Sequence, residues 1–304
     1  MDLILAVGEI LFDMLPGGRR LGGAPFNFAY HIHRLNGPLR FLSRIGNDPD
    51  GRAIEDILNA VGFPQDDLQR DPEHPTGRVR VTLDAEGSPQ FEILPGVAYD
   101  YIVSTAALER FVAQECRLIY FGSLIQRTGQ GAATLQRILS KRGPETKCLF
   151  DVNLRPDCWN AETLKGSLKD TDLLKLNGDE LQILADINAI GGDIDAAVAA
   201  LMARFQIEVV ALTLGEQGSC LFTAEGRHDV QPAGEIAVKD TVGAGDAFAA
   251  MLAIGYLHGW PADRILASAS HLAAAVCGIA GATPTDDAFY DALQETLTIE
   301  GGHA

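Results

Sequence analysis

The feature that most constrains the fold is a regular alternation of short apolar runs with longer segments of helical periodicity. The runs from Leu118 to Phe121, from Cys148 to Val152 and from Leu173 to Leu176 are typical of strands that are buried on both faces. The segment from Ile194 to Phe205, which follows these runs, has the composition of a buried helix. This order predicts an α/β fold in which helices cover both faces of a mostly parallel sheet.

One segment departs from this rhythm. Residues from Val79 to Leu83 alternate between apolar and polar, and a second such stretch ends at Leu94. The pattern predicts an antiparallel hairpin with one solvated face, which is a candidate lid. The chain has 304 residues, and α/β folds of this size often have one sheet and one core, so we expect one large domain with a small appendage.

The charge of the chain restricts its ligands. Lys and Arg number 24 and Asp and Glu number 41, which gives a net charge of −17. Such a surface repels phosphate backbones, so we expect no nucleic-acid partner. A smaller anion such as ATP would have to be held by local features, namely helix N-termini, backbone amides and a few cations.

Three observations bear on location. Residues 1–7 lack a basic region and predict a first strand rather than a signal peptide. The five cysteines form no C-x-x-C pair, and their odd number suits reduced thiols in the cytoplasm. The segment from Ile265 to Thr285 has no charged residue, but its small and polar residues indicate a buried helix rather than a membrane span.

The strongest motif is Asp240-Thr-Val-Gly-Ala-Gly-Asp246, which leads directly into an apolar helix beginning near Ala247. Small residues let a ligand approach the backbone, and the helix start directs its free amides and dipole at that point. Asp246 would lie in the first turn, where it can accept a proton beside a bound phosphate. An ordinary glycine-rich turn is the alternative interpretation. The two flanking Asp residues and the anchored helix favour an anion site with Asp246 as a base.

This heptapeptide resembles the signature of the ribokinase-like (PfkB-type) carbohydrate kinases, and the segment from Gly22 to Ala29 resembles the N-terminal signature of that family. The resemblance extends over nearly the whole chain. It implies a ribokinase-like three-layer α/β/α domain of residues 1–304, with a small β lid formed from about 12–22 and 76–98. It also implies transfer of the γ-phosphoryl group of Mg·ATP to a primary sugar hydroxyl.

The resemblance also implies roles for individual residues. Asp246 is the implied base, and the implied anion hole is the backbone of Gly243, Ala244 and Gly245. Besides Asp246, the implied sugar-binding residues are Asp13, Gly22, Gly23, Asn27 and Arg155. The implied nucleotide-side residues are Asn177, Glu180, Thr213, Gly215, Gly218, Gly243, Gly245 and His271. Glu180 would act on Mg²⁺ through water, while Asp240 and Thr241 are the implied contacts of a possible K⁺.

Several of these residues can also be interpreted as having only a structural role. Asn27 and Asp13 suit a helix start and a turn, and Arg155 suits a surface loop. Glu180 could stabilise a helix N-terminus, and the segment from Thr213 to Gly218 could be a plain turn between strands. The pair Arg19-Arg20 indicates a solvated loop rather than a phosphate site.

The identity of the sugar remains open at this point. The segment Gly22 to Pro25, together with Asp151-Val-Asn-Leu-Arg155, resembles the fructokinase branch and favours fructose. Ribokinase, 2-keto-3-deoxygluconate kinase and nucleoside kinase are the alternatives within the family, and the family's lids favour a homodimer. Outside it stand a sugar-binding regulator without catalysis and a nucleotide-dependent dehydrogenase. The dehydrogenase is disfavoured because no G-x-G-x-x-G follows the first strand.

Overall fold

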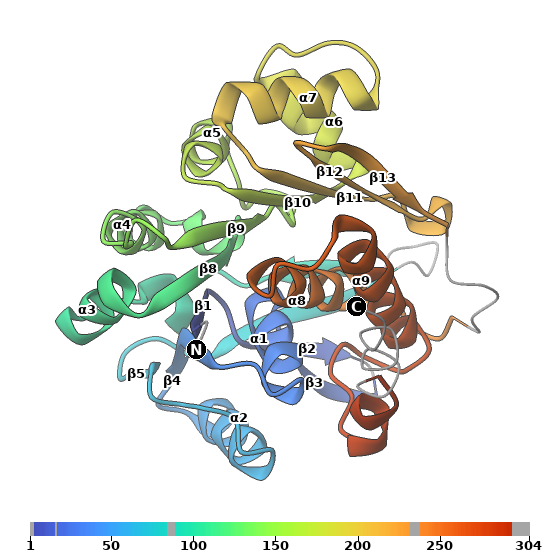
Figure 1. The fold of residues 1–304 in the computed structure, drawn as a ribbon. Helices are drawn as coiled ribbons and strands as arrows, with labels where there is room; N and C mark the ends of the chain where they lie inside the picture. The colour runs from blue at the N-terminus through green and yellow to red at the C-terminus, as the bar shows by residue number, and fades with distance from the viewer. Residues whose placement is uncertain (1–2, 16, 84–88, 232–237, 294–304) are drawn as a thin grey trace.

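The computed structural model describes residues 3–15, 17–83, 89–231 and 238–293. The strands of its main sheet are β1 (Leu3–Val7), β4 (Leu39–Gly46), β5 (Leu68–Asp71), β8 (Cys116–Gly122), β9 (Lys147–Asp151), β10 (Leu173–Asn177), β11 (Val209–Thr213), β12 (Ser219–Thr223) and β13 (Gly226–Val230). They lie in the order β13-β12-β11-β10-β9-β8-β1-β4-β5 (Figure 1). All neighbours from β11 to β5 are parallel, and only β12 and β13 add antiparallel pairs at one edge. The predicted mostly parallel sheet is confirmed.

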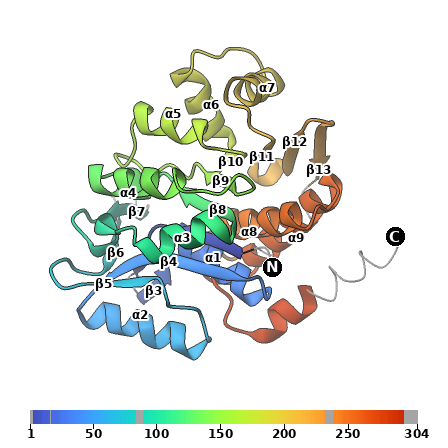
Figure 2. The ribbon, with the colours of Figure 1, turned by 60° about the vertical axis from the view of Figure 1, so that its left-hand side comes forward.

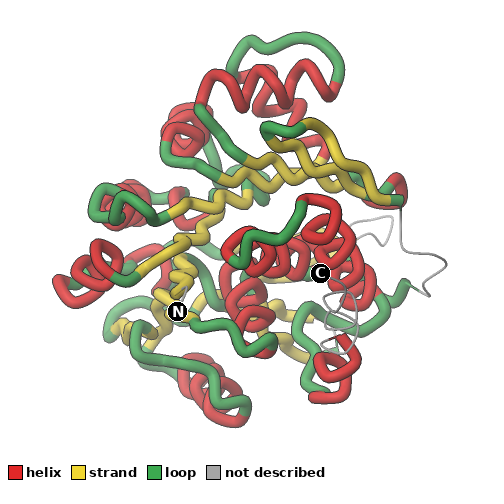
Figure 3. The backbone as a smooth tube through the Cα atoms, viewed as in Figure 1, coloured by secondary structure: helices red, strands yellow, loops and turns green. Residues whose placement is uncertain are grey.

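Helices cover both faces of this sheet, as the apolar strands require (Figure 3). One layer consists of α3 (Ala106–Gln114), α4 (Gly129–Leu139), α5 (Ala161–Lys169), α6 (Gly178–Ile187) and α7 (Ile194–Phe205). The other layer consists of α1 (Ala24–Arg34), α2 (Pro49–Ala60), α8 (Ala244–Leu257) and α9 (Ala262–Cys277). Alternate residues of β1 enter the two cores: Leu5 packs with the first layer and Ile4 with the second. Short 3₁₀ helices occur at η1 (Ala98–Tyr101), η2 (Leu124–Gln126) and η3 (Gly215–Gln217).

A second, small sheet is formed by β2 (Leu11–Leu15), β3 (Gly18–Gly22), β6 (Gly77–Leu83) and β7 (Pro89–Ile93), in the order β3-β2-β6-β7. The strands β6 and β7 are the predicted antiparallel hairpin, and their connecting residues 84–88 lie outside the described part of the chain. A parallel pairing of β2 with β6 joins this hairpin to the N-terminal pair β2 and β3. In Figure 2, β6 and β7 lie on the opposite side of the picture from β12 and β13.

Two helix boundaries differ from the sequence expectation. Helix α8 begins at Ala244, so Gly245 and Asp246 are themselves helical. Helix α9 ends at Cys277, within the uncharged segment, and among the described residues no helix is long and apolar enough to cross a membrane.

Candidate active site

The polar residues of the candidate site gather at one edge of the main sheet. Strand β1 leads into Gly8 and Glu9, β9 ends at Asp151, β10 ends at Asn177 and β11 ends at Thr213. Because these strands are parallel, their carboxyl ends lie at the same edge, where open α/β sheets bind ligands. The N-terminus of α8 reaches the same edge. Segments that are far apart in sequence therefore form one site.

Asp246 lies in the first turn of α8 and is almost fully buried, with 8% of its surface exposed. The side-chain amide of Asn27 in α1 donates a hydrogen bond to Oδ2 of Asp246 at 2.8 Å. The Oδ1 atom of the same Asn27 is buried and has no hydrogen-bond partner among the described residues. Asn27 thus orients the carboxylate and keeps an acceptor for a further hydroxyl group, which no simple helix-start role requires.

The carboxyl group of Asp246 loses its proton less readily than an exposed one. Burial raises the pKa of Asp246 to about 6, and the nearby charge of Asp151 acts in the same direction. Lys175, the hydrogen bond from Asn27 and the charge of Arg155 lower that pKa again. A carboxyl group with a pKa near 6 is ionised at neutral pH and still basic enough to take a proton from a positioned hydroxyl.

The turn before α8 is shaped for backbone contact with an anion. Gly243 is its N-cap residue, with a φ of 83° and a ψ of −6° in the left-handed region. The amide of Ala244 donates to the carbonyl oxygen of Thr241 at 3.3 Å. Helix geometry leaves the next amides, of Gly245 and Asp246, without acceptors inside the helix. These two amides and the helix dipole can bind a phosphate oxygen.

Replacing Gly243 by alanine should lower turnover roughly ten- to a hundredfold, because small displacements at a reacting centre have effects of this size. A Cβ atom on Gly243 would lie 2.3 Å from Cβ of Ala282 and must displace the turn. Gly259 is a matched control, since it also has a positive φ, of 63°, but no atom near its Cβ position. Steady-state turnover of G243A and G259A should differ by that factor. Equal turnover in the two variants would contradict the prediction.

The other predicted sugar-binding residues come from the small sheet and from the segments that follow β3 and β9. Asp13 lies on β2 of the small sheet, and its Oδ2 is 2.9 Å from the Cβ position of Gly22 at the end of β3. Gly23 connects β3 to α1, which carries Asn27. Burial raises the pKa of Asp13, while the positive charge of Arg155 and Arg20 lowers it. The structure brings these residues together, although the Arg155 side chain is exposed.

Glu9 belongs to this group as well, although the sequence analysis missed it. It is 5% exposed, and its Oε1 atom accepts a hydrogen bond from the amide of Ala24 at 3.2 Å. A Cβ atom on Gly23 would lie 2.6 Å from the carbonyl oxygen of Glu9, so the two loops are in close contact. Burial raises the pKa of Glu9 to about 7. Its position two residues after the first apolar strand was the available signal.

Asn177 and Glu180 form a capping box at the start of α6. The amide of Glu180 donates to Oδ1 of Asn177 at 2.9 Å, and the amide of Asn177 donates to Oε2 of Glu180 at 2.8 Å. Oε1 of Glu180 accepts from the amide of Leu154 at 2.9 Å. The simpler interpretation, helix stabilisation, therefore holds. Each carboxylate oxygen of Glu180 keeps one lone pair that can accept a further hydrogen bond, for example from water.

A pocket of about 520 Å³ lies between η3, the turn before α8, and α9. Its lining includes the predicted residues Thr213, Gly215, Gly218, Thr241, Ala244 and Gly245. The pocket adjoins Asp246 through Gly245, so a ligand in it could extend to the carboxylate. Its size and mixed lining suit a nucleotide.

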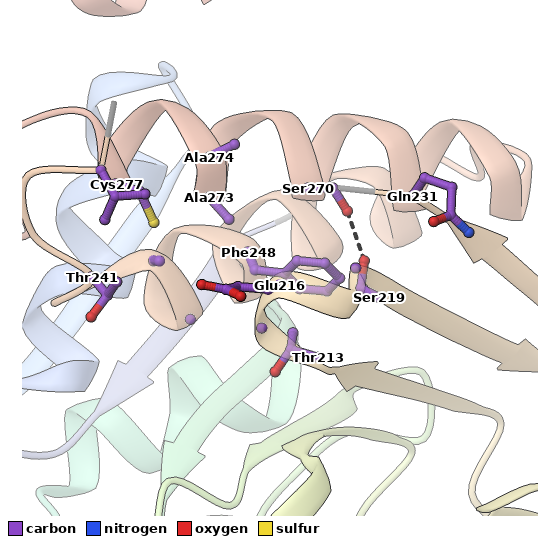
Figure 4. A pocket seen from close by; sticks show the side chains of 15 residues that line it. Thr213, Glu216, Ser219, Gln231, Thr241, Phe248, Ser270, Ala273, Ala274 and Cys277 are labelled. Atoms are coloured by element: carbon purple, nitrogen blue, oxygen red, sulfur yellow. Dashed lines mark hydrogen bonds between the residues drawn. The ribbon is translucent and has the colours of Figure 1, made fainter. Parts of the chain in front are cut away.

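The wall contributed by α9 differs from the sequence expectation at His271. Ser270, Ala273, Ala274 and Cys277 line the pocket, whereas His271 is exposed and is not a lining residue. Figure 4 shows Phe248 facing the same space. It also shows the hydrogen bond of 2.8 Å between the hydroxyls of Ser219 and Ser270. The helix was predicted correctly, but the face that it presents depends on its rotation against α8.

The expectation of a loop at Arg19-Arg20 is wrong, although Arg19 is exposed to solvent as expected. Both residues lie on β3, and Arg19 forms an ion pair with Asp50. Arg20 donates to Oδ2 of Asp240 at 3.1 Å, and this carboxylate also accepts from the backbone amides of Val242 and Gly281. The small sheet is therefore bound directly to the turn that leads into α8.

A buried ion pair beneath the site was also missed. Lys175 on β10 is 7% exposed, and its Nζ atom lies 3.0 Å from Oδ1 of Asp151 on β9, which is fully buried. The hydroxyl of Tyr120 donates to Oδ2 of the same carboxylate at 3.2 Å. The lysine is flanked by leucines in an apolar run, so the sequence pattern marked it only as part of a strand.

A nucleotide-sized pocket beside a buried carboxylate, on a mostly parallel sheet that helices cover on both faces, suits a phosphotransferase. Comparison with protein families agrees with this class. The model of the pfkB family of carbohydrate kinases matches residues 16–288, and the chain belongs to this family.

Two relatives and two solved structures illustrate the similarity. The chain is 31% identical to a fructokinase of Klebsiella pneumoniae over 97% of this chain and 99% of that protein. It is 28% identical to a fructokinase of Salmonella typhimurium over 92% and 93% of the two chains. An uncharacterised sugar kinase of Pyrococcus horikoshii superposes with a TM-score of 0.79 at 28% identity, covering 97% and 100%. A fructokinase of Vibrio cholerae with fructose, ADP and calcium ion superposes with a TM-score of 0.78 at 25% identity, covering 96% and 99%.

Proposed function

We propose that this kinase transfers the γ-phosphoryl group of ATP to a primary hydroxyl of a sugar, and that the sugar is fructose. The observation that carries the proposal is the buried Asp246, held by Asn27 at the helix N-terminus that closes the nucleotide-sized pocket. The fructokinase relatives and the Gly22–Pro25 segment support fructose as the acceptor.

In the proposed reaction the sugar lies between the small sheet and α8. Asp13, Gly22, Gly23, Asn27 and Arg155 bind and orient its hydroxyls, and Asn27 offers its unpaired Oδ1. Asp246 removes the proton of the attacking hydroxyl, and the first amides of α8 stabilise the charge that develops on the transferred group. Mg²⁺ supplies neutralisation of the phosphate oxygens when bound, with Asn177 and Glu180 as its contacts through water.

The small sheet is proposed to close over the sugar and to exclude water. Its strands β2 and β3 carry Asp13 and Gly22, which supports this role. A homodimer through the same sheet and a cytoplasmic location complete the proposal, and five free cysteines fit a reducing compartment. K⁺ at Asp240 and Thr241 stays a prediction, as does nucleotide contact by His271.

The test is a coupled ADP-release assay with fructose, ribose, 2-keto-3-deoxygluconate and adenosine, each with and without K⁺. We expect the highest kcat/KM with fructose. A higher kcat/KM with ribose, the ketodeoxy acid or adenosine would reassign the substrate within the family. Absence of ADP release with every acceptor would favour a sugar-binding regulator.

A further inference from the structure

The ion pair between Lys175 and Asp151 stands directly beneath the turn that binds the anion. A Cβ atom on Gly245 would lie 2.8 Å from Nζ of Lys175, so the ammonium group reaches the first turn of α8. Asp151 comes from β9 and Lys175 from β10, two neighbouring strands that end at the candidate site. The pair therefore links the carboxyl edge of the sheet to the helix that carries Asp246.

Burial makes this pair costly, and a structural role alone explains it poorly. Removing an ammonium and a carboxylate from water costs several kcal/mol for each ion. A protein in which apolar residues of similar size replace a buried ion pair is often as stable as the original. The neighbouring residues of both strands are leucines and a phenylalanine that are fully buried. The presence of Lys175 at this position therefore indicates a functional role in addition to packing.

The charges around Asp246 provide that reason. If the ammonium group were absent, Asp246 would face the carboxylate of Asp151 with only the charge of Arg155 to balance it among the cations that act on it. Two neighbouring carboxylates cannot both ionise easily, so one would keep its proton at neutral pH. The charged and titratable groups that act on or near Asp246 come from five segments and are Glu9, Tyr120, Asp151, Arg155 and Lys175. Of the two cations, Arg155 is exposed and Lys175 is buried.

We infer that Lys175 is a positioning residue for phosphoryl transfer: its ammonium group balances Asp151 and thereby holds Asp246 in the carboxylate form that accepts the proton. The inference rests on the proposed role of Asp246 as the base. Lys175 contacts neither substrate in this scheme and acts through the two aspartates. The raised pKa of Lys175, caused by Asp151, Glu180 and Asp246 against the effect of burial, agrees with a permanent charge.

The experiment is the pH dependence of kcat/KM for the sugar between about pH 5 and 9. In the unchanged protein the acidic limb should lie near pH 6, where Asp246 titrates. In K175M this limb should move upward by about one unit or more. The loss of activity should therefore be roughly fivefold or more at pH 6 and smaller at pH 9. An unchanged limb in a folded K175M would overturn the inference.

Two further variants keep the test decisive if K175M folds poorly. D151N removes the opposing charge and should move the limb to lower pH. The double variant D151N/K175M leaves neither member of the buried ion pair charged, and its limb should lie above that of D151N. Coincident limbs in these two variants would also overturn the inference. K147M is the matched control, because Lys147 forms its ion pairs with Asp172 and Glu208 at the other end of β9.

Failure of the inference can be separated from failure of the proposed function. If D246N retains turnover, Asp246 is not the base and the proposed mechanism falls. If D246N is inactive while the acidic limbs do not respond to Lys175, only the role of Lys175 falls.

Discussion

Asp246→Asn should reduce turnover by about 10² to 10⁴, the range that a positioned general base contributes. The substitution preserves the size of the side chain, and an amide oxygen can still accept the hydrogen bond from Asn27. It removes the proton acceptor and a negative charge that burial already disfavours. The free energy of unfolding should therefore stay the same or rise. Binding of the sugar and of ATP, measured by calorimetry, should change little.

Asp263→Asn is the matched control for this variant. Asp263 also lies in the first turn of a helix, α9, but its side chain is 83% exposed and pairs with His228. Turnover in D263N should equal that of the unchanged protein. Normal turnover in D246N would refute the assignment of the base, whatever the control shows.

Arg127→Met should lower the free energy of unfolding by about 3–5 kcal/mol, the usual cost of breaking a buried ion pair from one side. Arg127 binds both oxygens of Asp100, at 2.7 and 2.8 Å, and donates to the carbonyl oxygen of Leu94 at 2.9 Å. The side chains of Arg127 and Asp100 are only 7% and 2% exposed. The variant would leave a buried carboxylate without its cation, which chemical denaturation would measure.

Two comparisons check the cause of this loss. Arg137→Met breaks an exposed pair with Glu109 and should cost much less. The double variant D100N/R127M removes both charges and should recover part of the stability lost in R127M. A loss in R127M no larger than in R137M would show that the buried pair contributes little.

The fold was largely predictable because its strands are buried on both faces. Strands β8, β9 and β10 stand out as apolar runs, and their apolar side chains are buried. Strand β5 was not predicted, since it is an edge strand with the sequence Leu-Gln-Arg-Asp and pairs only with β4. The formation of β5 depends on its pairing with β4, which a short window of sequence around β5 does not include.

The candidate site was predictable only where short motifs carry it. Asp246 and Asn27 lie in such motifs, and the structure brings their side chains into contact. Lys175 carries no local signal and Glu9 only its position after the first strand, because their importance comes from burial beside groups on other strands. On α9 the prediction differs from the pocket wall at His271, where the neighbouring Ser270 lines the pocket, because the rotation of a helix follows from its packing against α8.

The connection between the small sheet and the base has a consequence for the coupling of ATP use to sugar phosphorylation. A single residue, Gly23, separates the last residue of β3 from the first residue of α1, and Asn27 is one turn further. Arg20 on the same strand also binds the turn before α8. A tilt of β3 would therefore change the hydrogen bond to Asp246 and the anion-binding turn at the same time. The position of β3 can therefore determine how well Asp246 accepts a proton. If β3 takes its active position only when a sugar is bound, hydrolysis of ATP by water stays slow.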